Sequence, residues 1–152
     1  MSVVEFDLSS TEIEETRMSA PVVIATIGRA DYETRLEDGT HTWFADEPAS
    51  LGGADTAPQP SSLLLSSLGA CTSITLRMYA KRKGWPLESL RVELSMTSTA
   101  DGTVIDRRIS LDGPLDETQR ERLLQIANAC PMHKVLAGAI RIDSGLVPAE
   151  PV

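Results

Sequence analysis

The chain holds two cysteines, Cys71 and Cys130, and these are the side chains with the most reactive chemistry. Cys130 stands directly before Pro131, and a proline that cannot continue one helix can begin the next. We therefore expect Cys130 at a helix N-terminus, where backbone N–H groups favour a thiolate. An inert Cys130 fits its position equally well. Cys71 lies in a helical pattern and, taken alone, fits an inert buried thiol.

Two thiols that meet in space could support the chemistry of a thiol peroxidase. One thiolate attacks the O–O bond of a peroxide, and a nearby cation or donor holds the thiolate and the leaving alkoxide. A second thiol then condenses with the sulfenic acid before it is oxidised further. The sequence offers these parts, but the spacing of Cys71 and Cys130 does not by itself bring them together.

The histidines, His41 and His133, offer weaker alternatives. Cys71, Cys130 and His133 could supply three zinc ligands, but ligand count alone does not make a metal site, and we predict none. A Cys–His hydrolase is not favoured, because no third group that would orient the histidine is apparent. We also expect no organic cofactor.

Composition narrows the class of protein further. The 152 residues suit one domain, and the formal net charge is -8, with 22 acidic and 14 basic side chains. This balance argues against nucleic-acid binding and against docking on anionic membranes. The first residues are acidic rather than basic, so they do not resemble a secretory signal. We expect a cytoplasmic protein whose cysteines form no permanent structural bridge.

Hydrophobic periodicity predicts the elements that position the cysteines. We expect an acidic arm over residues 1–20, and then strands over 22–27, 32–36 and 40–44 with an Asp38-Gly39 turn between the last two. A loop rich in proline and glycine covers residues 46–60. A long helix follows over 61–83, and its predicted buried face carries Leu64, Leu68, Cys71, Thr75 and Met78.

The second half of the chain alternates strands and shorter helices. A strand over 90–97 turns at Asp101-Gly102 into another over 104–111. Asp116 and Gln119 form a capping box for a helix that ends near Cys130. We expect a short helix from Pro131, a last strand over 139–142 and a flexible tail over 147–152. The fold class is therefore α+β, with one domain over 21–146.

Several segments resemble the OsmC/Ohr family of peroxide-stress proteins, and more closely its OsmC-like subgroup. Residues 63–80 are similar to that family's first-cysteine helix, and residues 129–136, Ala-Cys-Pro-Met-His-Lys-Val-Leu, are similar to its second-cysteine motif. Residues 45–48, 51–55 and 82–87 also resemble the family. The similarity runs in order over about residues 21–145.

The resemblance implies an OsmC-like fold, with antiparallel sheets around a long central helix, in an intertwined homodimer. It implies that Cys71 is the peroxidatic cysteine and Cys130 the resolving one, joined in a disulfide during turnover. The implied substrates are organic hydroperoxides, both alkyl and lipid. The implied reductant is a dithiol, such as a lipoyl protein, and the implied role is antioxidant defence against oxidative stress.

The chain also departs from the family pattern. The family's supporting arginine best matches Arg29, with Arg35 in reserve, while the glutamate expected ten residues before Cys71 is replaced by Ser61. Asp46, Glu47 or Asp55 could stand in for that glutamate. The departure leaves open a catalytically weak dimer that binds a lipid-like or other small ligand. A sulfur carrier that uses a Cys71 persulfide is a further alternative.

Overall fold

The computed structural model describes residues 21–148, which divide at Pro60 into two compact units. The predicted arm over 1–20, and the last four residues of the predicted tail, lie outside the described residues. The domain boundaries predicted after residues 20 and 146 stay predictions.

The first unit is built on a three-stranded antiparallel sheet with the order β1-β2-β3. Each strand begins two residues later than predicted, at 24, 34 and 42 rather than 22, 32 and 40. The strands are β1 (Ile24–Ile27), β2 (Thr34–Glu37) and β3 (Thr42–Ala45), and a short 3-10 helix, η1 (Ala49–Leu51), follows.

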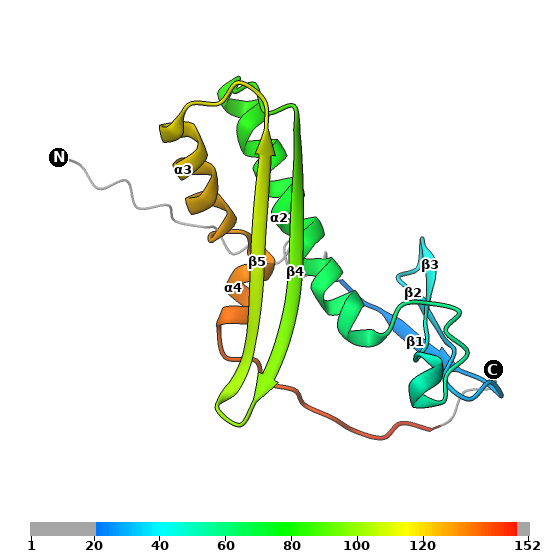
Figure 1. The fold of residues 1–152 in the computed structure, drawn as a ribbon. Helices are drawn as coiled ribbons and strands as arrows, with labels where there is room; N and C mark the ends of the chain where they lie inside the picture. The colour runs from blue at the N-terminus through cyan, green and yellow to red at the C-terminus, as the bar shows by residue number, and fades with distance from the viewer. Residues whose placement is uncertain (1–20, 149–152) are drawn as a thin grey trace, which may run out of the picture. The chain divides into compact units, whose positions relative to one another are not determined.

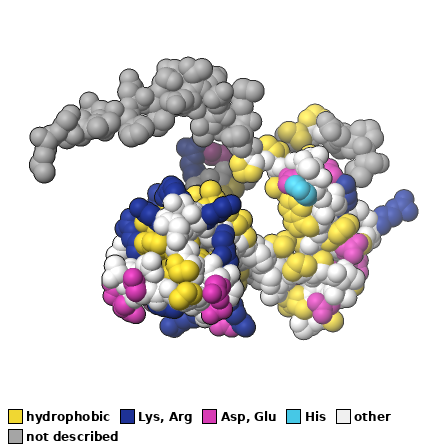
Figure 2. Space-filling view, turned by 90° about the horizontal axis from the view of Figure 1, so that it is seen from above, with side chains coloured by type: hydrophobic (Ala, Val, Ile, Leu, Met, Phe, Trp, Pro, Cys, Tyr) yellow, Lys and Arg dark blue, Asp and Glu magenta, His cyan; other side chains and the backbone are white. Residues whose placement is uncertain are grey.

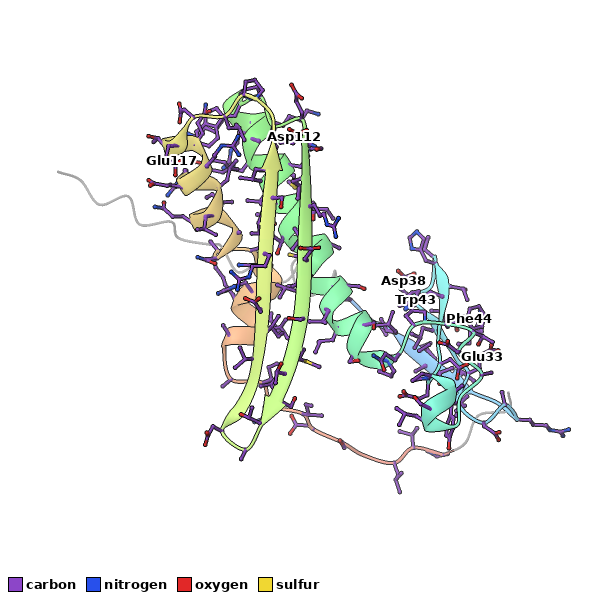
Figure 3. All side chains as sticks on the ribbon, in the orientation of Figure 1. Glu33, Asp38, Trp43, Phe44, Asp112 and Glu117 are labelled. Carbon is purple, nitrogen blue, oxygen red and sulfur yellow. The ribbon has the colours of Figure 1, made fainter. Side chains whose placement is uncertain are left out.

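The predicted Asp38-Gly39 turn joins β2 to β3. Asp38 Oδ1 accepts hydrogen bonds from the backbone N–H groups of Thr40 and His41, at 2.9 and 2.7 Å. Gly39 has a φ of 88°, a conformation that glycine adopts without steric cost. Figure 3 labels Asp38 on this unit together with Glu33, Trp43 and Phe44.

The second unit places a long two-stranded hairpin against helices (Figure 1). The hairpin turns at Ala100-Asp101, between the paired Thr99 and Gly102, and its register sets Leu94 opposite Arg107. Asp112 and Glu117 flank the connection from the hairpin to the next helix (Figure 3). The elements are α2 (Pro60–Lys83), β4 (Ser89–Thr99), β5 (Gly102–Asp112), α3 (Glu117–Ala127) and α4 (Pro131–Ala137).

One face of the hairpin is covered by the helices of its unit. Alternate residues of β4 and β5 are half-buried while those between them are exposed, as the sequence alternation predicts. Helix α2 approaches β4 closely at Gly69, where an added Cβ would lie 2.8 Å from Leu94 Cδ1. The core of this unit comprises Leu76, Ala80, Leu87, Leu115, Leu123 and Ala127.

Local signals for the helices are confirmed. Helix α2 begins at Pro60, one residue before the predicted start, and ends at Lys83 as predicted. Asp116 and Gln119 form the predicted capping box of α3. Pro131 opens α4 with Cys130 as its N-cap. Within residues 21–148, no helix has the length and hydropathy needed to cross a bilayer.

The predicted buried face of α2 is confirmed at Leu68 and wrong at Leu64 and Met78. Residues Leu68, Thr72, Leu76 and Ala80 are the buried ones, whereas Met78 is 66% exposed and Leu64 39% exposed. The helix has apolar side chains on two faces, and only one of them packs against its own unit. In Figure 2, apolar side chains are visible between the basic ones on this unit.

The predicted strand over 139–142 is also absent, because residues 138–148 form neither helix nor strand. Ile140 and Ile142 are 58% and 83% exposed. A strand needs a neighbour to accept and donate its backbone hydrogen bonds, and this segment pairs with no described strand of the chain. The apolar alternation is present, but no described strand of the chain pairs with the segment.

Candidate active site

Cys130 lies in the short connection between α3 and α4, and its side chain is fully buried. It is the N-cap of α4, with φ -64° and ψ 148°, and its Sγ accepts a hydrogen bond from the His133 backbone N–H at 3.4 Å. Pro131 has no N–H of its own and starts the helix, which leaves the His133 N–H available to the sulfur. The sequence prediction of a capping thiol is therefore confirmed.

Helix α2 brings two further side chains to this sulfur. Thr72 Oγ1 lies 3.8 Å from Cys130 Sγ, and Thr72 is fully buried on the packed face of the helix. Cys71, the residue before Thr72, is half-buried, and its side chain is one of the groups that lower the pKa of the Cys130 thiol. Both cysteines are free thiols. The structure thus brings together the two cysteines that spacing alone could not unite.

Strand β5 contributes Arg107, a residue that sequence reasoning missed. Its Nη1 donates to Thr72 Oγ1 at 3.0 Å and to the Ala127 carbonyl at 3.2 Å. Its Nη2 donates to Asn128 Oδ1 at 2.9 Å and lies 3.4 Å from His133 Nδ1. The alternation of Ile105, Arg107 and Ile109 offered a signal, because it places a cation on the apolar face of the hairpin.

These contacts favour the ionised form of Cys130. Burial opposes ionisation, but the His133 N–H, the Thr72 hydroxyl, the Cys71 thiol and the charge of Arg107 outweigh it. Together they lower the pKa of the Cys130 thiol below its ordinary value. The site therefore has a neighbouring pair of thiols, one of them shielded from solvent and stabilised as a thiolate.

The remaining predicted site residues lie on or beside the first unit. Arg29 is exposed in the connection between β1 and β2. The reserve candidate, Arg35, forms an ion pair with Glu37 and donates to Thr42 Oγ1 at 3.4 Å. Ser61 is half-buried in the first turn of α2. An approach of Arg29 to Cys71 stays a prediction.

Of the loop carboxylates, Asp46 organises the loop itself. Its oxygens accept hydrogen bonds from the backbone N–H groups of Glu47, Ala54 and Thr56, and from the Thr56 hydroxyl. The Thr56 N–H, with the other donors, lowers the pKa of Asp46 below its usual value. Burial of the carboxylate opposes this effect but does not outweigh it. The carboxylate is therefore already engaged within its own unit.

A hollow of about 390 Å³ opens beside Arg107 in the second unit. Thr103, Arg107, Asn128 and His133 supply its polar wall. Within residues 21–148 no three His, Cys, Asp or Glu side chains are grouped as metal ligands. The apolar wall of the hollow comprises Leu68, Ile105, Leu124, Leu136 and Ala137.

Solved structures share this fold at low sequence identity. An OsmC-like protein from Mycoplasma pneumoniae is 20% identical, with a TM-score of 0.68 over 78% of this chain and 87% of that one. An organic hydroperoxide resistance protein OsmC from Legionella pneumophila is 24% identical, with a TM-score of 0.58 over 78% and 89%. The organic hydroperoxide resistance protein OhrB of Bacillus subtilis is 23% identical, with a TM-score of 0.57 over 80% and 93%.

Sequence comparison identifies the family directly. No protein with a curated description matches the chain. Residues 52–145 match the family described as OsmC-like protein, and this segment contains both cysteines, Thr72 and Arg107. The match covers more than half of the chain, and the chain belongs to the OsmC-like family.

Proposed function

We propose that the chain is a two-cysteine thiol peroxidase that reduces organic hydroperoxides. The observation that carries the proposal is the neighbouring pair of free thiols, Cys71 and Cys130, of which the second is held by donors that favour its thiolate. The family and the hydroperoxide resistance proteins among its structural neighbours support the same substrate class.

The difference in accessibility between the two cysteines supports the roles that we propose for them. Cys71 is half-buried and can meet a peroxide, whereas Cys130 has no exposed surface. The Cys71 thiolate attacks one peroxide oxygen, the O–O bond breaks, and the alkoxide leaves with a proton as an alcohol. Cys130 Sγ then attacks the Cys71 sulfenic acid, water leaves, and a disulfide forms. A dithiol reductant, such as a lipoyl group, restores both thiols.

A homodimer is part of the proposal. Helix α2 leaves Ile74 and Met78 exposed, and the segment after α4 leaves Ile140 and Ile142 without a strand to pair with. Large exposed apolar side chains that line one helix face are typical of a protein–protein interface. A second copy of the chain would cover these apolar side chains. We also propose that Arg29 is the arginine that supports the Cys71 thiolate. The expected setting is a reducing one, the cytoplasm.

The test is oxidation by cumene hydroperoxide followed by intact mass and peptide mapping. Mild peroxide should lower the mass by about two hydrogens and yield a Cys71–Cys130 disulfide that dithiothreitol reverses. Cys71→Ser should abolish turnover, and Cys130→Ser should leave a sulfenic acid that dimedone traps. Ser73→Ala, on the same helix, is the matched control and should leave turnover unchanged. A wild-type chain that keeps both thiols under these conditions contradicts the proposal.

A second candidate function is ligand binding by a catalytically weak dimer. Ser61 in place of a carboxylate favours it, and so does the hollow beside Arg107, which combines an apolar wall with a cation. Native mass spectrometry of the purified protein would then show a co-purified small molecule. Its peroxide reactivity would match that of a free thiol.

A further inference from the structure

Arg107 on β5 contacts residues of three helices of the second unit. Its guanidinium donates to Thr72 on α2, to the carbonyl of Ala127 at the end of α3, and to Asn128 directly after α3. The fourth contact, with His133 Nδ1, reaches α4. Two of these residues, Thr72 and His133, also contact Cys130 Sγ, so the position of the sulfur depends on the guanidinium.

Two hydrogen bonds connect Arg107 to Cys130 through the Thr72 hydroxyl. An arginine only donates, so Thr72 Oγ1 must accept from it, and the Thr72 hydroxyl hydrogen is then free to point at Cys130 Sγ. The ion pairs found among residues 21–148 involve other arginines, so no described carboxylate neutralises the charge of Arg107. Both features favour negative charge on the sulfur.

We propose that Arg107, acting through Thr72, is a positioning residue that makes Cys130 the leaving thiolate when the Cys71–Cys130 disulfide is reduced, so that the reductant attacks Cys71. This inference rests on the proposed disulfide. The thiolate of a dithiol forms a bond to Cys71 Sγ, the Cys71–Cys130 bond breaks, and its electron pair remains on Cys130. The second thiol of the reductant then attacks the reductant sulfur that is bonded to Cys71. Cys71 leaves as a thiolate, and the two sulfurs of the reductant form a disulfide.

Access and leaving-group chemistry both select this direction. Cys130 has no exposed surface, whereas Cys71 is half-buried. In thiol–disulfide exchange the sulfur with the lower pKa leaves faster. The titratable and charged groups that face Cys130 are Cys71 on α2, Arg107 on β5 and His133 on α4. Thiolate ultraviolet absorbance of the reduced chain reports the two cysteines directly, without a contribution from the histidine or the arginine.

The experiment begins from protein oxidised with diamide, which needs no peroxide. The oxidised chain is mixed with 2-mercaptoethanol, quenched in acid and mapped by peptide mass. The wild type should carry the adduct on Cys71. A sulfur with a higher pKa leaves more slowly, so Arg107→Met should slow cleavage of the disulfide by about threefold or more. In the reduced chain Arg107→Met should also move the rise in thiolate ultraviolet absorbance to higher pH.

Matched variants separate positioning from folding. Arg108→Met removes a cation from the exposed face of β5, where Arg108 pairs with Asp106, and should leave rate and adduct position unchanged. Arg107→Lys keeps the positive charge but loses the planar, two-armed guanidinium. It should recover part of the cleavage rate that Arg107→Met loses. If Arg107→Met does not fold, Thr72→Val against Thr72→Ser tests the same chain of hydrogen bonds.

The outcomes distinguish this inference from the proposed function. An adduct on Cys130 in the wild type, or thiolate absorbance of the reduced chain that rises at the same pH in Arg107→Met as in the wild type, overturns the inference alone. Inertness toward peroxide together with an adduct on Cys71 overturns the peroxidase and leaves the inference standing. Failure of diamide to join the two cysteines overturns both.

Discussion

The second apolar face of α2 leads us to a prediction about the proposed homodimer. Ile74 and Met78 stand one turn apart on this helix and are 59% and 66% exposed, whereas Thr72, Leu76 and Ala80 on the other face are buried. Beside Met78 a hollow of about 560 Å³ is lined by side chains of α2 together with Ile126 and Ala129. We expect Met78→Lys to dissociate the homodimer while the single chain stays folded.

The magnitude follows from the area that remains exposed. Full burial of a side chain of this size contributes about 1.5–3 kcal/mol, so two thirds of it contributes roughly 1–2 kcal/mol. A symmetric dimer contains the residue twice, which gives about 2–4 kcal/mol and a rise in Kd of about 30- to 1000-fold. Two lysines brought toward each other across the interface would raise the Kd further.

Sedimentation equilibrium at several protein concentrations measures this Kd, and circular dichroism checks the fold. The control is Val104→Lys on β5, which charges an apolar side chain that is 62% exposed and should leave the Kd within about threefold. A wild-type chain that stays monomeric at every concentration would refute the reasoning. So would a Met78→Lys dimer of wild-type affinity.

Three further predictions concern the core and the titration of single groups. Leu123→Ala, at a fully buried position, should lower the free energy of unfolding by about 2–5 kcal/mol in urea denaturation. The pKa of Cys130 is lowered from 9.0, so its ionisation stabilises the fold fully above pH 9.0, and that stabilisation disappears as the pH falls through the folded value. The stability of the wild type relative to Cys130→Ala should therefore rise with pH up to about 9. The backbone N–H of His41, with that of Thr40, lowers the pKa of Asp38 to about 2, so an NMR titration should find its midpoint there. Its contribution to stability should disappear as the pH falls from 3.8 to about 2.

Sequence reasoning succeeded where a few neighbouring residues decide the structure. The Asp116 capping box, the start of α4 at Pro131 and the turn at Asp38-Gly39 each depend on local hydrogen bonds and backbone preferences. The same local logic placed Cys130 at a capping position before any tertiary contact was considered. Each of these signals depends on residues within about four positions of one another, so a single sequence is enough to predict the cap or turn.

It failed where the deciding partner is distant along the chain. Helix α2 has two apolar faces, and periodicity cannot tell which one its own hairpin covers. The strand predicted over 139–142 has the right alternation, but a strand forms only beside another strand. Arg107 was missed for the same reason. Its inward position was visible in the alternation of β5, but its partners on α2, α3 and α4 were not.

A structural role alone does not account for the surroundings of Cys130. A neutral buried thiol behaves as a small hydrophobic group and needs no donors, whereas placing a guanidinium at a half-buried position costs desolvation free energy. The bonds from Arg107 to Ala127 and Asn128 do close the end of α3, and a structural role explains those two. It does not explain the third bond, to Thr72, which turns a buried hydroxyl toward the sulfur. An ionised Cys130 explains it, because a thiolate gains from each donor that a thiol would not require.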